Sequence, residues 1–117
     1  MSSRSVHGEV SSSDASAGVA FTLFAAAGTE EESVGASERL EITSLSIVVG
    51  SALTVDVFTG SDMTASAGER IAKGNFAASG GMVVPLPTSR ICPAGTVPRL
   101  KTSGSGQVDA ILHGVIR

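Results

Sequence analysis

Few residues in this chain could do chemistry. Its 117 residues include two histidines, His7 and His113, and one cysteine, Cys92, with no tryptophan and no tyrosine. The histidines are far apart in the sequence and neither stands at the spacing of metal ligands, so we expect no metal and no cofactor. Cys92 has no histidine or basic pair beside it that would lower its pKa, which favours a small buried side chain over a nucleophile. We therefore predict that the protein is not an enzyme.

The glycine-rich and serine-rich stretches carry no catalytic motif. Residues 74–81 and 104–106 lack the Gly-Lys-Ser/Thr ending of a phosphate-binding loop, and no serine stands in a Gly-x-Ser-x-Gly elbow. The net charge of -3 and the pI near 5.2 give no basic field for nucleic acid. No apolar run approaches the roughly 18 residues of a membrane helix. We predict neither a nucleic-acid partner nor a membrane partner.

Short apolar runs separated by Gly, Ser, Ala and Pro recur along the chain, which is the pattern of an all-β domain. We expect seven to eight short strands, the clearest at residues 39–49, 53–58 and 107–116. Breaks in the alternation and long central connections favour a jelly-roll or Greek-key β-sandwich over a meander. The Ser-rich residues 1–17 can bury little, so we expect an N-terminal arm there and a β-sandwich domain at residues 18–117. Within the arm, residues 6–10 could form a short strand.

The longest predicted strand changes the parity of its apolar residues midway. Leu40 and Ile42 share one parity, and the apolar residues from Leu45 onward share the other. A two-residue period cannot change phase without an extra residue, so we expect a bulge or bend near Thr43–Ser44. Strands with apolar residues on both parities cannot all face one core. The sequence therefore predicts a second apolar contact, made with other copies of the same chain.

A family resemblance extends over most of the chain beyond the N-terminal arm, and four segments carry it. They are residues 35–43 (GASERLEIT), 55–60 (VDVFTG), 67–81 (AGERIAKGNFAASGG) and 106–116 (GQVDAILHGVI). Together they resemble the capsid decoration, or cement, proteins of tailed bacteriophages, which are small β-sandwich virion proteins. The resemblance implies a homotrimer that binds the outer surface of the phage head and clamps adjacent major capsid subunits. It also implies synthesis in the host cytoplasm and a final location on the virion.

The expected arm is the segment from which we predict contacts. Arg4, Val6, His7 and Val10 could anchor it against the capsid or a neighbouring copy, for example by adding a strand to an exposed sheet edge. The alternative function is a receptor-binding or carbohydrate-binding jelly-roll module of a phage tail or fibre. The missing tryptophan and tyrosine count against that alternative, because they are the usual platforms for sugar rings.

Overall fold

A computed structural model describes residues 3–59 and 70–117 of the chain. These residues form ten β-strands and no helix. In chain order the strands are β1 (Arg4–Asp14), β2 (Val19–Ala20), β3 (Thr22–Ala25), β4 (Glu31–Glu32), β5 (Leu40–Val49), β6 (Leu53–Phe58), β7 (Arg70–Phe76), β8 (Gly81–Ile91), β9 (Arg99–Thr102) and β10 (Ser105–Ile116). Of the four segments that carry the family resemblance, the start of the one at residues 67–81 lies outside the described residues.

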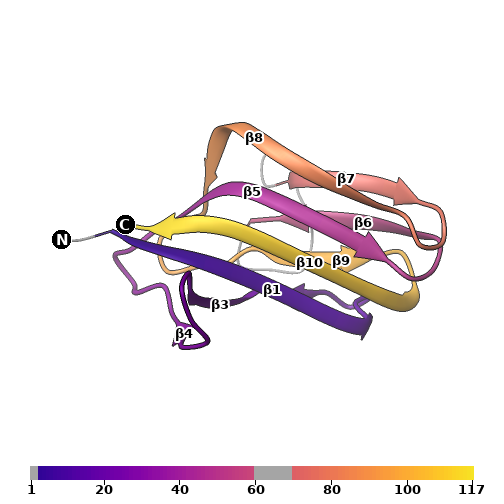
Figure 1. Cartoon of the computed structure of the whole chain (residues 1–117), viewed down its shortest axis with the longest axis horizontal. Helices are drawn as coiled ribbons and strands as arrows, with labels where there is room; N and C mark the ends of the chain where they lie inside the picture. The colour runs from indigo at the N-terminus through magenta and orange to yellow at the C-terminus, as the bar shows by residue number, and fades with distance from the viewer. Residues whose placement is uncertain (1–2, 60–69) are drawn as a thin grey trace.

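The strands form two antiparallel sheets that pack against each other (Figure 1). The large sheet has six strands in the order β4-β3-β1-β10-β5-β8, and the small sheet has four in the order β2-β9-β6-β7. The hairpin β3–β4 is an addition at one edge of the large sheet. Among the other eight strands, the first in the chain pairs with the last, the second with the second last, and so on: β1 with β10, β2 with β9, β5 with β8, and β6 with β7. That wrapping is the jelly roll. The predicted all-β sandwich is confirmed.

The N-terminal residues belong to the sandwich and are not an arm. Residues 4–14 form β1, which lies inside the large sheet between β3 and β10 and is antiparallel to both. Val6 and Val10 point into the core and are 1% and 4% exposed. The predicted boundary after residue 17 is therefore wrong. Alternate positions 6, 8 and 10 supply a strand's inward face, and serines fill much of the outward face, so the serine content hid the period of two.

The predicted bulge in the strand at 39–49 is confirmed. Thr43 has no partner in either neighbouring strand, because the pairing with β10 and with β8 passes directly from Ile42 to Ser44. The extra residue turns both halves of β5 toward the same core: Ile42 is 1% exposed and Leu45 is 2% exposed. The parity change at Thr43 therefore leaves no apolar face outside, because the bulge returns both halves of the strand to one core. Val48 of β5 and Ile111 of β10, on the parity opposite to the core residues, do face solvent. The contact with other copies of the chain stays a prediction.

The chain crosses from one sheet to the other at Phe21. β2 pairs with β9 in the small sheet, and β3 pairs with β1 in the large one. Phe21 lies between these strands, is 3% exposed, and donates its backbone N–H to the carbonyl oxygen of Pro98 at 3.0 Å. The aromatic ring fills the space between the sheets at this end of the sandwich, beside the added hairpin β3–β4.

Candidate functional site

The outer face of the large sheet carries exposed apolar side chains. Val48 of β5 is 55% exposed, Val83 of β8 is 75% exposed and Ile111 of β10 is 42% exposed. Val83 and Ile111 both lie directly opposite Ser46, one on each side of β5, and Val48 is the next outward residue along that strand. Diagonal neighbours of this kind are about 7–8 Å apart, so the three side chains form one cluster. We call Val48, Val83 and Ile111 the apolar patch.

The outer face of the small sheet is polar and internally paired. The Thr54 hydroxyl donates to the Asn75 side-chain oxygen at 2.7 Å, and Arg70 Nε donates to Asp56 Oδ1 at 3.0 Å. Lys101 lies opposite Asp56 on the neighbouring strand. Among the described residues, the exposed large hydrophobic side chains all belong to β5, β8 and β10 of the large sheet. The two outer faces therefore differ in kind.

The free edge of the large sheet next to the patch is unsuited to strand addition. β8 is the edge strand there, and it contains Pro85 and Pro87. Proline has no backbone N–H to donate, and prolines in edge strands interrupt the row of groups that another strand would pair with. A protein partner at this end of the sheet would therefore contact its face and not its edge.

The four residues predicted to make contacts have different positions in the structure. Val6 and Val10 are buried in the core, so the prediction that they contact a partner is wrong. Arg4 forms a hydrogen bond within the chain: its Nη1 donates to Glu38 Oε2 at 2.7 Å. This hydrogen bond, with a second from the Gly35 N–H, lowers the pKa of Glu38 to about 2. Of the four, His7 is the one on the outer face of the large sheet.

His7 and His113 lie directly opposite each other in the pairing of β1 with β10. The His7 ring stacks on Phe24 of β3 with ring centroids 5.4 Å apart, and its Nε2 is 3.8 Å from the Glu9 carboxylate. The Nδ1 atom of His113 is 3.4 Å from the Ser44 hydroxyl. No local sequence pattern predicts this pair, because the two residues stand near opposite ends of the chain. Only the pairing of the first strand with the last brings them together.

Cys92 is buried, as predicted. Its side chain is 0% exposed, and burial raises the pKa of the thiol to about 12. A protonated, enclosed thiol is a poor nucleophile and a poor metal ligand. Its backbone N–H donates to the carbonyl oxygen of Leu40 at 2.9 Å, so this residue fixes the end of β8 against β5.

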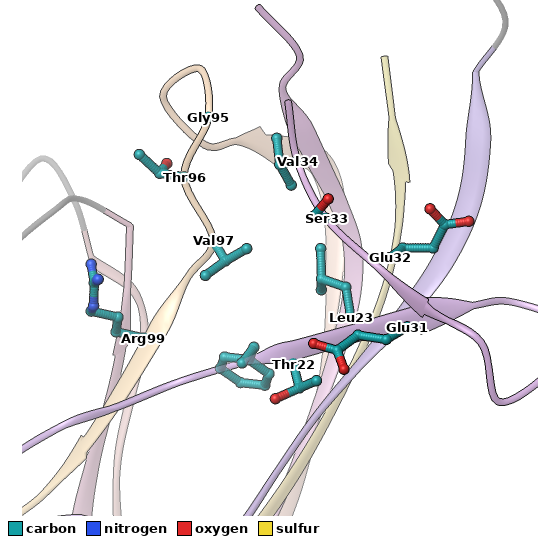
Figure 2. A pocket seen from close by; sticks show the side chains of 11 residues that line it. Thr22, Leu23, Glu31, Glu32, Ser33, Val34, Gly95, Thr96, Val97 and Arg99 are labelled. Atoms are coloured by element: carbon teal, nitrogen blue, oxygen red, sulfur yellow. The ribbon is translucent and has the colours of Figure 1, made fainter. Parts of the chain in front are cut away.

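A pocket of about 480 Å³ lies between the added hairpin β3–β4 and the segment that leads into β9 (Figure 2). Figure 2 shows Val97 on one side, with Val34 and Leu23 on the other. The remaining lining residues are Phe21, Thr22, Glu31, Glu32, Ser33, Gly95, Thr96 and Arg99. Hydroxyl and charged groups beside apolar side chains can hold a small polar ligand by hydrogen bonds. None of the described residues that line it is a histidine or a cysteine.

Comparisons with known proteins add no identification. No protein-family model, no curated protein and no solved structure matches the chain. Within the described residues there is no group of three or more histidine, cysteine, aspartate or glutamate side chains placed to hold a metal ion. That part of the chain also has no helix long and apolar enough to cross a membrane. The resemblance to the decoration proteins stays a prediction.

Proposed function

We propose that this chain is a structural virion protein that binds the outer surface of a phage head as a homotrimer and stabilises the shell by clamping adjacent major capsid subunits. The observation that carries the proposal is the apolar patch on one outer face of a sandwich whose opposite outer face is polar. Clustered exposed apolar residues on one side of a small domain are typical of a protein-binding surface.

The dimensions of the large sheet support a protein contact. The molecule measures 43 × 30 × 26 Å, and Figure 1, viewed down the shortest axis, looks onto the broad side of the sandwich. A stable interface uses roughly 800 Å² per partner, which fits on a face of this size. Hydrogen-bonded strands hold the patch rigid, so little conformational entropy is lost when a partner binds.

Multivalent binding explains how such a surface could stabilise a shell. One apolar patch of three side chains binds weakly alone. A trimer presents the same surface three times, and after the first contact the others bind at high effective concentration. The jelly roll suits this task because its strands wrap into a compact, stiff unit, and the fold is common among virion proteins.

Co-sedimentation with phage heads that lack this protein tests the proposal. The wild-type chain should sediment with the heads and raise the temperature at which they rupture. The double variant Val83→Glu/Ile111→Glu should stay in the supernatant, because charge in the apolar patch must be desolvated on binding. Lys73→Glu is the matched control, since it changes the net charge equally but lies on the outer face of the small sheet.

The control variant should bind as the wild type does. Wild-type protein that does not sediment with heads, or a double variant that binds normally, contradicts the proposal. Sedimentation equilibrium of the free protein tests the trimer separately. A single species of 11.7 kDa at micromolar concentration contradicts the trimer.

The pocket supports a second candidate function, a receptor-binding or carbohydrate-binding module. Its hydroxyl groups on Thr22 and Thr96 and its carboxylate on Glu31 are groups that hydrogen-bond to sugars. Binding to a glycan array that is lost in Thr22→Val/Thr96→Val, but kept in Val83→Glu/Ile111→Glu, would favour this function over the first.

A further inference from the structure

The two histidines of the chain stand side by side on a solvent-facing surface. His7 and His113 are direct partners in the pairing of β1 with β10. Val6 and Leu112, their neighbours in sequence, are buried, so both imidazoles project from the outer face of the large sheet. Directly opposite residues in an antiparallel pair have Cβ atoms about 4.5–5.5 Å apart. We propose that His7 and His113 together chelate one divalent transition-metal cation, with Zn²⁺ as the test ion.

The chemistry of the pair fits such a cation. Neutral imidazole is a preferred ligand of Zn²⁺, Cu²⁺ and Ni²⁺, and a zinc–nitrogen bond is about 2.0–2.1 Å long. Two imidazoles on opposite Cβ atoms can therefore reach one ion between them. Water completes the coordination, because within the described residues no third histidine, cysteine or carboxylate is preplaced with them as a ligand group.

Metal binding requires both rings to turn toward each other. The His7 ring now rests on Phe24, and Nδ1 of His113 is 3.4 Å from the Ser44 hydroxyl. The hydroxyl contact is long and weak. The His7 side chain is 24% exposed, so its rotation gives up part of the contact with Phe24, and the bond to the ion offsets that loss. After rotation each imidazole still has one ring nitrogen for the ion and one for water or a neighbouring side chain.

The local charge favours a cation. The Glu9 carboxylate lies 3.8 Å from Nε2 of His7, on the same outward face of β1. Asp109 lies four residues before His113 on the same outward face of β10. Its carboxylate accepts a hydrogen bond from Ser11 at 2.6 Å. Arg117, as far from His113 in the other direction as Asp109, is paired with Glu41 at 3.1 Å, so Glu9 and Asp109 leave the surface around the pair negative. Glu9 is close enough to orient a histidine or a bound water.

The proposal is tested by titrating Zn²⁺ into the purified chain and following binding by calorimetry and stability by thermal unfolding. The test does not depend on the proposed virion function. The wild type should bind one Zn²⁺ per chain saturably, and the ion should raise the melting temperature because it binds the folded state. His7→Ala and His113→Ala should each weaken binding by roughly tenfold or more, since one ligand remains where two acted together.

A relocated histidine separates a chelating pair from two independent histidines. His7→Ala/Ser11→His keeps two histidines but puts one opposite Asp109, roughly 13 Å along the strand from its former position. This variant should bind Zn²⁺ no better than His7→Ala. Both histidines are on the surface, so the variants should keep the wild-type circular dichroism spectrum. Wild-type affinity in the relocated variant, or in either single variant, overturns the proposal, as does a wild type with no saturable Zn²⁺ binding.

Discussion

The outer faces of the two sheets are built from the same kind of strand but carry different side chains. On the small sheet, Asp56 pairs with Arg70 at 3.0 Å and polar groups satisfy one another. On the large sheet, Val83 is 75% exposed, with Val48 and Ile111 close by. Folding a sandwich requires apolar inner faces only, and either outer face could be polar. The fold therefore does not require the apolar patch, and this is why we propose it as a protein-binding surface.

Deleting Thr43 should have the largest effect, because it removes the residue that keeps apolar side chains inside. Without the bulge, either Leu40 and Ile42 or the apolar residues from Leu45 onward must face solvent. The difference between the two outer faces would then be lost along with the core. We expect no cooperative unfolding transition, measured by circular dichroism in a urea titration.

The substitution Thr43→Ala is the control for this deletion, because it preserves the residue count. The Thr43 side chain is exposed and its hydroxyl donates to the carbonyl oxygen of His113 at 3.1 Å. Losing that hydrogen bond should cost about 1 kcal/mol or less. A deletion variant as stable as Thr43→Ala would show that the bulge does not set the register.

Neighbouring residues of β10 separate the inner face from the outer face. Leu112 is 0% exposed and Ile111 is 42% exposed. Leu112→Ala should lower the free energy of unfolding by about 2–5 kcal/mol, because it leaves a cavity in the core. Ile111→Ala should cost about 1 kcal/mol or less, because its side chain is only partly removed from water. Urea unfolding with an unchanged m-value measures both; equal losses would mean that Ile111 serves the fold and not a partner.

The sequence predicted the strands that have a large apolar residue at almost every second position. The change of parity in β5 located the bulge near Thr43, and the lack of a histidine or basic pair beside Cys92 predicted its burial. β1 was expected as an arm with at most a short strand at residues 6–10, because only Val6 and Val10 interrupt its serines and polar residues with large apolar side chains. Its full length and its place inside the large sheet depend on pairing with β10, a partner at the other end of the chain, which no local pattern can reveal.

The candidate site was less predictable than the fold, because it depends on which face each side chain takes. Val6 and Val10 were expected at a contact and are in the core. Val83 and Ile111 carry no motif, and their exposure follows only from the register of β5 with both of its neighbours. A shift of one residue in that register would have reversed the assignment of every side chain.

The ion pair between Arg4, at the start of β1, and Glu38, just before β5, should make a pH-dependent contribution to stability. Arg4 lowers the pKa of Glu38 from 4.5 to about 2. A carboxylate whose pKa is lower in the folded than in the unfolded state stabilises the fold at any pH above its unfolded-state pKa. This contribution is lost as the pH falls from 4.5 toward 2. Glu38→Gln should be less stable than the wild type at pH 7, and the difference should shrink over that range. Urea unfolding across the range measures it; a difference independent of pH contradicts the assignment.

The smallest effect is expected at the ion pair on the outer face of the small sheet. Arg70 and Asp56 have side chains that are 36% and 23% exposed, so solvent screens their attraction. Exposed pairs of this kind contribute about 0–1 kcal/mol, and Arg70→Gln should lower the free energy of unfolding by no more than that. It should also leave the sedimentation behaviour unchanged, because the apolar patch lies on the other sheet. Lys73→Gln, which removes a charge beside the same Asp56 without breaking the ion pair, is the control. If Arg70→Gln alters the oligomer while Lys73→Gln does not, the small sheet also contacts a partner, and the polar face is then an interface as well.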